Sequence, residues 1–218
     1  HRYVSARASE LLDVPAESSR VVTCHLGNGS SIAAVLGGKC VDTTMGLTPL
    51  EGLPMGTRSG SIDPAVIQFV SDRAGISLGD VITILNKESG VLGVSGVSSD
   101  FRDIEAAAGS GNARARLALE IFYYQTLKYV SSYIGVLGGA DAIVFTAGLG
   151  ENSPSAREAI VERLGGIGIT IDKEKNKTRG VLAEITGEGS NSRVFVIPTN
   201  EELVIARDTK QLVSNISA

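Results

Sequence analysis

The sequence predicts an α/β fold with a mixed sheet flanked by helices. Strand-like runs come first, and the Gly37-Gly38 pair that separates two of them is typical of a β-hairpin. Helical patterns follow, and strands then alternate with helices toward the end of the chain. A hairpin pairs its strands antiparallel, whereas strand–helix alternation is typical of parallel pairing, so a sheet that contains both is mixed.

The first half of the chain begins with a helix and continues with strands. Residues 3–12 form the end of a helix, which Asp13 and Pro15 stop. We expect strands at 20–26, 31–36 and 39–43, and helices opened by Asp63-Pro64, at 77–87 and at 98–108. Between them, residues 44–63 are rich in Gly, Pro and Thr and show little periodicity. Ordered loops of this length are uncommon in compact domains and are often functional.

The second half contains the longest predicted helix, residues 112–136, which is apolar on most sides and is therefore expected to be central and buried. A buried strand at 142–146 runs into Gly148-Leu149-Gly150. We also expect strands at 167–171, 183–186 and 194–197, and helices at 155–164 and 201–213. No repeat, low-complexity tract or linker divides the sequence, which favours one domain over residues 1–218.

Composition and charge argue against several functional classes. Of the 218 residues, 43% are hydrophobic and 20% are charged, which is ordinary for a globular protein. The net charge is −4 and basic residues do not cluster, so nucleic-acid binding is not expected. The sequence has neither the ~20 uninterrupted apolar residues of a membrane span nor a signal peptide, and we expect a cytoplasmic protein without membrane contact.

The two cysteines and the first residue bear on the origin of the chain. Cys24 and Cys40 could lie close together on paired strands. A domain of this size does not need a disulfide bond, however, and a reduced protein is the better interpretation. Because His1 stands where a complete protein has Met, the sequence is expected to start within a longer protein or after processing, with a tag remnant as the other interpretation.

Two segments have the composition of anion-binding loops. His25-Leu26-Gly27-Asn28-Gly29 joins two predicted antiparallel strands, and its glycines let the backbone turn tightly and present N–H groups to a phosphate. Farther along, Arg58 stands between hydroxyl residues and glycines, where its guanidinium fork suits an oxyanion. The simpler interpretations are an ordinary hairpin turn with a structural histidine, and a surface arginine in a flexible loop.

Two further segments precede helices. In Gly148-Leu149-Gly150-Glu151-Asn152, a buried strand meets a glycine turn that either presents N–H groups to a ligand or simply connects a strand to a helix. This segment is neither the GxGxxG fingerprint of dinucleotide-binding folds nor a Walker P-loop. Pro198-Thr199-Asn200-Glu201-Glu202 fits helix capping without any metal. The cysteines and histidines lack zinc-site spacing, and no Gly-x-Ser-x-Gly elbow of a hydrolase occurs.

The order of these segments along one chain resembles the acetate kinase family. The resemblance covers essentially the whole chain and rests on the motifs His25-Leu-Gly-Asn-Gly, Asp42-Thr-Thr-Met-Gly-x-Thr-Pro-Leu-Glu-Gly, Gly56-Thr-Arg-Ser-Gly, Gly148-x-Gly-Glu-Asn and Thr199-Asn-Glu-Glu-Leu. It implies a ribonuclease-H-like (actin-like ATPase) domain of the sugar kinase/Hsp70/actin superfamily. It also implies that residues 1–218 are the C-terminal, nucleotide-binding domain of a two-domain kinase whose N-terminal domain is absent from this sequence.

The family transfers the γ-phosphoryl group of ATP to acetate, with Mg²⁺ or Mn²⁺, and yields acetyl phosphate and ADP. The resemblance assigns the transition-state arginine to Arg58 and the metal-linked acid to Glu201. It assigns the nucleotide contacts to three segments, which are His25, Leu26, Gly27, Asn28 and Gly29; Asp100, Phe101 and Arg102; and Gly148, Leu149, Gly150, Glu151 and Asn152. The family is dimeric through this half, so a homodimer is expected, with the 112–136 helix either part of the interface or simply core.

Other groups of the family's active site match nothing in the sequence. The aspartate essential for transfer, a metal-linked asparagine and an acyl-site arginine belong to the other half, and the transition-state histidine would precede His1. We therefore expect the isolated 218 residues to bind nucleotide at best and to be inactive. The alternatives are a propionate or butyrate kinase, a non-catalytic nucleotide-binding module of the Hsp70/actin class, and a structural domain that only dimerises. The Asp42–Gly52 motif favours acetate, and the Arg58 loop argues against the non-catalytic module.

Overall fold

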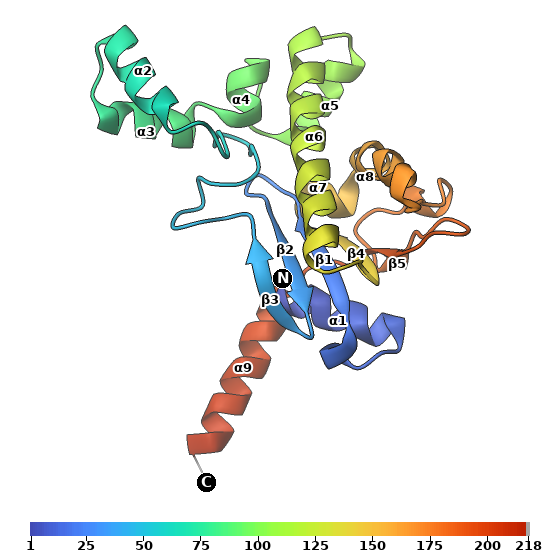
Figure 1. The fold of residues 1–218 in the computed structure, drawn as a ribbon. Helices are drawn as coiled ribbons and strands as arrows, with labels where there is room; N and C mark the ends of the chain where they lie inside the picture. The colour runs from blue at the N-terminus through green and yellow to red at the C-terminus, as the bar shows by residue number, and fades with distance from the viewer. Residues whose placement is uncertain (217–218) are drawn as a thin grey trace.

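The computed structural model describes residues 1–216, which form a six-stranded sheet with helices on both faces (Figure 1). In sheet order, the strands are β3 (Lys39–Thr43), β2 (Ser31–Leu36), β1 (Arg20–His25), β4 (Ala142–Thr146), β6 (Arg193–Val196) and β5 (Ala183–Glu184). The β1–β4 and β4–β6 pairs are parallel, whereas β1–β2, β2–β3 and β5–β6 are antiparallel. The predicted mixed sheet and its hairpin are therefore confirmed.

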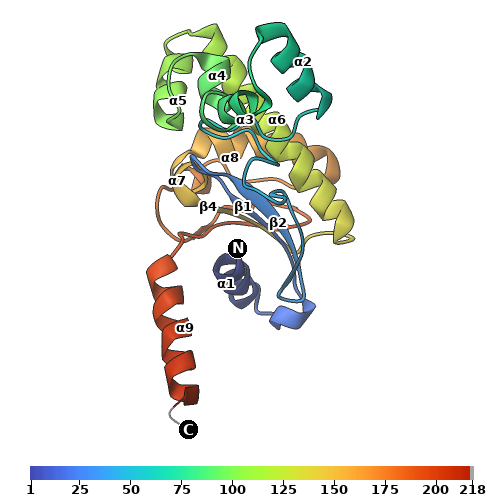
Figure 2. The same ribbon diagram turned by 90° about the vertical axis from the view of Figure 1, so that its left-hand side faces the viewer.

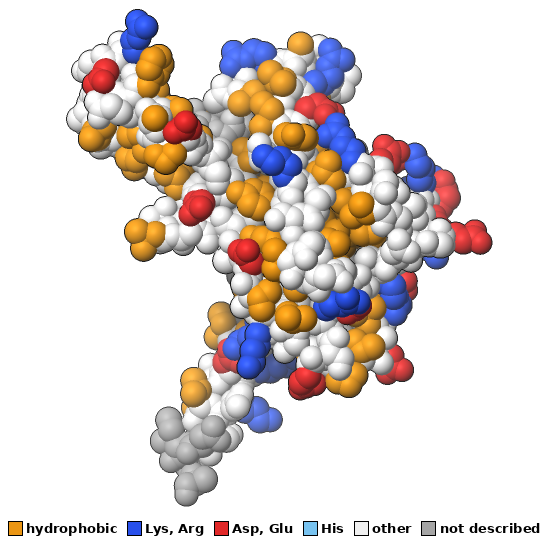
Figure 3. Space-filling model, in the orientation of Figure 1, with side chains coloured by type: hydrophobic (Ala, Val, Ile, Leu, Met, Phe, Trp, Pro, Cys, Tyr) orange, Lys and Arg blue, Asp and Glu red, His pale blue; other side chains and the backbone are white. Residues whose placement is uncertain are grey.

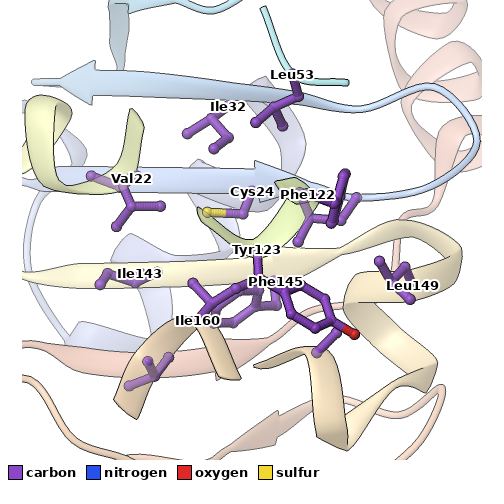
Figure 4. Close-up of a cluster of buried hydrophobic side chains, with 14 of the residues drawn as sticks. Val22, Cys24, Ile32, Leu53, Phe122, Tyr123, Ile143, Phe145, Leu149 and Ile160 are labelled. Carbon is purple, nitrogen blue, oxygen red and sulfur yellow. The ribbon is translucent and has the colours of Figure 1, made fainter. Parts of the chain in front are cut away.

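The central strands are buried on both faces because their side chains alternate between two hydrophobic cores. Val21 and Val144 pack on one face, beneath α1 (Arg2–Leu12). Val22 and Phe145 belong to the larger core on the other face, which α6 (Ala113–Val136) and α8 (Pro154–Val161) cover (Figure 4). Burial of both faces is typical of parallel strands in α/β proteins.

The long helix α6 is central, as predicted, but it is not buried all round. Its buried side chains pack against the sheet and against α4 (Gly90–Ser95) and α5 (Phe101–Gly109). Leu117 and Tyr124, in contrast, each keep 53% of their surface exposed. The outward face of the helix therefore remains apolar in part.

The remaining helices lie on opposite sides of the sheet. α2 (Ala65–Ala74) and α3 (Leu78–Lys87) gather with α4 and α5 at one end of the molecule (Figures 1 and 2). α9 (Glu201–Ile216) extends away from the body on the side that carries α1 (Figure 2), and an Arg2–Asp208 ion pair links the two helices. Exposed apolar side chains of α2 and α3, among them Phe69 and Leu78, contribute to the hydrophobic surface at that end (Figure 3).

The structure corrects the sequence predictions in three places. The predicted strand at 167–171 is wrong, because the segment Glu162–Ile167 forms the 3-10 helix η2 and Gly168 then turns with φ of 79°. Of that run, Ile171 makes a single bridge to Thr186. Helix α4 was not expected, and the segment after β4 is a short helix, α7 (Ala147–Asn152), rather than an open glycine turn. In each case glycines break the apolar periodicity on which such predictions rest.

Both cysteines are free thiols, in agreement with the reduced interpretation. Cys24 is buried in β1, and burial raises the pKa of its thiol because the charged form loses hydration. Cys40 is exposed on β3, and β2 separates the two strands. Among the described residues, no helix is long and apolar enough to cross a membrane.

Candidate functional site

A pocket of about 580 Å³ lies where β1 and β4 end, between α5, α7 and the chain that follows α8. Its size is ordinary for a small-molecule site. The lining includes residues from all three segments that were predicted to contact nucleotide, namely His25, Gly27, Asn28, Gly29, Asp100, Phe101, Arg102, Gly148, Leu149 and Asn152. Segments more than a hundred residues apart in the sequence thus meet at one edge of the sheet.

The first wall is the turn between β1 and β2. The Ser30 hydroxyl closes this turn, since it donates to the Gly27 carbonyl at 2.8 Å and accepts the Gly27 N–H at 3.1 Å. Leu26 is fully buried and does not line the pocket. Its carbonyl instead accepts the N–H groups of Leu149, at 2.8 Å, and Gly150, at 3.1 Å. Leu26 therefore joins the turn to the start of α7.

Arg58 lies beside the same turn. A smaller cavity of about 200 Å³ is lined by Asn28, Gly29, Gly56, Thr57, Arg58 and Ser99. The Gly56 N–H donates to the Asn28 carbonyl at 3.0 Å, which fixes the arginine loop to the turn. A Cβ atom on Gly29 would lie 3.8 Å from Nη1 of Arg58. The loop arginine and the glycine turn, predicted separately, thus form one arrangement of donors.

Helix α4 supports the arginine loop from behind. The loop carbonyls of Met55 and Gly56 accept the first N–H groups of α4, from Val91 at 2.9 Å and Leu92 at 3.0 Å. Gly90 has φ of 59°, and a Cβ atom there would lie 2.1 Å from the Met55 carbonyl oxygen. The loop can approach α4 this closely because the helix begins with glycine.

The second wall is the start of α5. Asp100 caps the helix by accepting the Arg102 N–H at 2.9 Å, and it also pairs with the Arg102 guanidinium at 2.5 Å. These bonds to Arg102 lower the pKa of Asp100 to about 2. Phe101 is buried, with its ring 4.6 Å from that of Phe122. Packing of Phe101 thus holds the start of α5, and with it the Asp100–Arg102 ion pair, at the rim of the pocket.

The third wall is α7, which begins with Ala147 in a left-handed conformation, at φ of 65°. Oε1 of Glu151 accepts the N–H groups of Ala147, at 2.7 Å, and Thr199, at 3.1 Å. Neither Glu151 nor Gly150 lines the pocket. Both belong to the predicted segment, but they hold the wall in place rather than form its surface.

Four lining residues were missed by sequence reasoning: Glu105, Ala147, Ser153 and Arg179. The Glu105 carboxylate accepts the hydroxyl of Ser153 at 2.5 Å, which ties α5 to α8. Arg179 donates to the Asn152 carbonyl from a segment that carries no recognisable motif. Ala147 and Ser153 directly flank the predicted Gly148–Asn152 segment, whereas no local sequence signal marks Glu105 and Arg179, which tertiary packing brings to the pocket.

The predicted metal-linked residue, Glu201, begins α9, but its side chain lies outside the described residues. Asn200 caps the helix as expected, with Oδ1 accepting the Leu203 N–H at 3.0 Å. Within the part of the chain that is described, no three His, Cys, Asp or Glu side chains form a group able to hold a metal ion. The described residues thus provide no all-protein metal cage, which Mg²⁺ seldom uses when it binds substrate phosphates.

The comparisons with known proteins agree with this geometry. The model of the acetokinase family matches residues 1–207. The acetate kinase of Methanosarcina barkeri is 61% identical over 213 residues, which cover 98% of this chain and 52% of that protein. The crystal structure of the Porphyromonas gingivalis acetate kinase superposes on this chain with a TM-score of 0.95 and 46% identity, and the match covers 98% of this chain and 54% of that one. The crystal structure of a Francisella tularensis propionate kinase superposes with a TM-score of 0.88 and 44% identity, over 94% of this chain and 52% of that one.

The chain spans about half the length of the relatives it matches and shares the ribonuclease-H-like, actin-like ATPase fold that the resemblance implied. Because the family model matches nearly the whole chain, this chain belongs to the acetokinase family.

Proposed function

We propose that this chain is the C-terminal, nucleotide-binding domain of an acetate kinase, which transfers the γ-phosphoryl group of ATP directly to acetate and yields acetyl phosphate and ADP. The observation that supports this most is the position of Arg58 beside the turn at Gly29, next to a pocket lined by all three predicted nucleotide segments. The relatives have about twice the length of this chain, and the other half would provide the remaining acetate-site groups.

In this proposal, the turn from His25 to Gly29 holds the phosphates through its backbone N–H groups. Phosphoryl transfer depends mainly on alignment and on stabilising the charge of the equatorial oxygens, and Arg58 would donate to those oxygens as acetate attacks in line. Asp100, Arg102 and the α7 wall would hold the nucleoside. When bound, Mg²⁺ or Mn²⁺ would supply further positive charge at the phosphates, with Glu201 as its protein ligand.

The exposed apolar residues, the cysteines and the net charge bear on the oligomeric state, the location and the partners of the protein. Leu117 and Tyr124 are half exposed on α6, and this apolar strip supports a homodimer formed through that helix. Two free thiols are consistent with a reducing compartment, and we infer a cytoplasmic protein. Acetate and ATP are the expected small-molecule partners, and the net charge of −4 gives no reason to expect nucleic acid.

Two preparations test this function: the 218 residues alone and the product of the complete open reading frame that encodes them. The complete product should form acetyl phosphate from ATP and acetate, whereas the 218 residues should bind ADP in calorimetry without turnover. Turnover by the 218 residues would show that the essential groups lie within them. If neither preparation releases heat with ADP, the domain is a structural one.

A propionate or butyrate kinase is the second candidate, because the similarity to the propionate kinase structure, at 44% identity, is almost as high as that to the acetate kinase structure. The two candidates differ in acceptor, so kcat/KM measured with acetate, propionate and butyrate separates them. A clear preference for propionate or butyrate would replace acetate in the proposal and leave the nucleotide site unchanged.

A further inference from the structure

Arg179 lines the pocket from the segment that follows α8, where it contacts Asn152, the last residue of α7. The N–H groups of Leu149 and Gly150 bind the Leu26 carbonyl, which places the start of α7 against the turn. α7 then leads away from the turn to Asn152, whose carbonyl accepts a hydrogen bond from Nη1 of Arg179. If the phosphates of a nucleotide occupy the turn, the rest of the ligand has the α7 wall beside it, and Arg179 contacts the last residue of that wall.

A buried arginine holds the chain that carries Arg179. Arg157 is fully buried, and Nη2 donates to the carbonyls of Asn176, at 2.6 Å, and Thr178, at 2.7 Å. The same guanidinium donates from Nη1 to the Gly150 carbonyl at 2.8 Å and from Nε to Oδ1 of Asn176 at 2.8 Å. Arg157 thus fixes the residues on both sides of the contact between α7 and the Arg179 segment.

The clamp formed by Arg157 differs from an ion pair in the charge of its acceptors. The bonds that Arg157 makes in the described part of the chain all go to neutral oxygens, and burial, together with the nearby charge of Arg179, lowers its pKa to about 10. Burying a cation is unfavourable unless its donors are satisfied, which these carbonyls achieve. The neighbouring Gly180 N–H is fixed as well, by the Glu151 carbonyl at 3.1 Å. The backbone on both sides of Arg179 is therefore held rigidly.

The two arginines that line the pocket differ in their partners. Arg102, on α5, forms a close ion pair with Asp100. Arg179 stands on a different wall and, among the described residues, has no ion-pair partner within 4.0 Å. A guanidinium group in this setting is planar, weakly hydrated and able to stack on an aromatic face. A nucleotide base held along the α7 wall would offer it such a face.

We propose that Arg179 recognises the nucleotide base by stacking its guanidinium group on the ring, and that Arg157 is the positioning residue that holds it there. This inference rests on the proposed nucleotide-binding function. It adds to the predicted site a base contact from a segment without any motif.

The test compares ADP with tripolyphosphate, which has phosphates but no base, in calorimetry on the complete protein. In Arg179→Gln and Arg179→Lys, the Kd for ADP should rise about tenfold, because the planar cation is lost. Tripolyphosphate affinity should stay near that of the wild type. Arg116→Gln is the matched control, since Arg116 is another exposed arginine that donates to a backbone carbonyl, that of Gly111 at 3.4 Å.

Three results would overturn the assignment to the base. They are an unchanged ADP affinity in Arg179→Gln, an equal loss of tripolyphosphate affinity, and full ADP affinity in Arg179→Lys. If the wild-type protein binds neither ADP nor ATP, the proposed function itself fails, and that outcome is distinct from a failure confined to the variants.

The positioning role of Arg157 has its own test. Asn176→Ala removes the side-chain acceptor of Arg157 Nε and leaves both arginines in place. It should weaken ADP binding several-fold in the wild-type background and cause no further loss in Arg179→Gln, because both changes act through one contact. Additive losses would mean that the clamp acts on the fold in general and not through Arg179.

Discussion

Replacement of Gly90 by alanine tests whether α4 positions the arginine that we assign to phosphoryl transfer. Gly90 opens α4 with φ of 59°, and an added Cβ would lie 2.1 Å from the Met55 carbonyl oxygen and 2.6 Å from the Arg58 carbonyl oxygen. Non-bonded carbon and oxygen atoms do not approach so closely, so the loop has to move by about 1 Å. Arg58 belongs to this loop, and it moves as well.

The expected magnitude follows from this displacement. A misplacement of about 1 Å in a positioned group can lower the rate of the chemical step roughly 10²-fold. The left-handed backbone adds a separate cost in stability of ~1–2 kcal/mol for any residue with a Cβ atom. Gly75 isolates this second cost, since it has φ of 65° and nothing within 4 Å of an added Cβ. Gly75→Ala should therefore lose stability but keep its activity.

The assay is acetyl phosphate formation by the complete protein, with thermal unfolding measured on the same samples. Gly90→Ala should lower kcat about a hundredfold more than Gly75→Ala does, with a small change in KM for ATP, because the nucleotide pocket lies on other elements. Equal kcat values for the two variants, at equal folded fractions, would refute the idea that α4 positions Arg58.

Three other changes probe single contacts of the site. Arg58→Ala should lower kcat at least a hundredfold, which corresponds to a loss of ~3 kcal/mol in transition-state stabilisation, and should leave ADP affinity near that of the wild type. An unchanged kcat would show that Arg58 takes no part in the chemical step. Glu151→Gln replaces the carboxylate that accepts the Thr199 N–H at 3.1 Å, just before the start of α9 and the proposed metal ligand Glu201. The concentration of Mg²⁺ needed for half-maximal activity should therefore rise several-fold. An unchanged metal requirement would show that Glu151 does not position the start of α9. Because bonds to Arg102 lower the pKa of Asp100 to about 2, the carboxylate stabilises the folded state above its unfolded pKa of ~4, and this contribution is lost as pH falls toward 2. The unfolding temperatures of the wild type and Asp100→Asn should therefore differ at pH 6 and converge toward pH 2, and a constant difference would contradict the linkage.

The elements that could be predicted from the sequence are those whose signals are local. The Gly37-Gly38 hairpin and the helix expected at 77–87 depend on residues within a few positions of each other, and both are present. The strand expected at 167–171 failed because the apolar run is flanked by glycines, and the left-handed turn at Gly168 stops the extended chain. Helix α4 is only six residues long, too short for a periodic pattern.

The residues of the candidate site also differ in whether a local sequence signal reveals them. Its glycine turn and its arginine loop could be found because each has an unusual local composition, and the motif order then linked them to a family. Arg179 and Glu105 could not be found, since neither residue stands out from its neighbours in the sequence and both reach the pocket only through the packing of α5, α7 and α8. Their contribution depends on long-range contacts that one sequence does not display.

Several residues of the recognised motifs do not contact the pocket at all, and the hydrogen bonds explain why they belong to the motifs. The buried Leu26 offers its carbonyl to α7, and Glu151 joins the start of α7 to Thr199. Gly150 joins α7 to the turn and to α8 through its backbone, since its N–H donates to the Leu26 carbonyl at 3.1 Å and its carbonyl accepts Nη1 of Arg157 at 2.8 Å. Each motif therefore contains both the surface that meets a ligand and the bonds that lock it to the next motif. A substitution at the buried Leu26 should consequently alter phosphate and base binding together, whereas one at Arg179 should alter base binding alone.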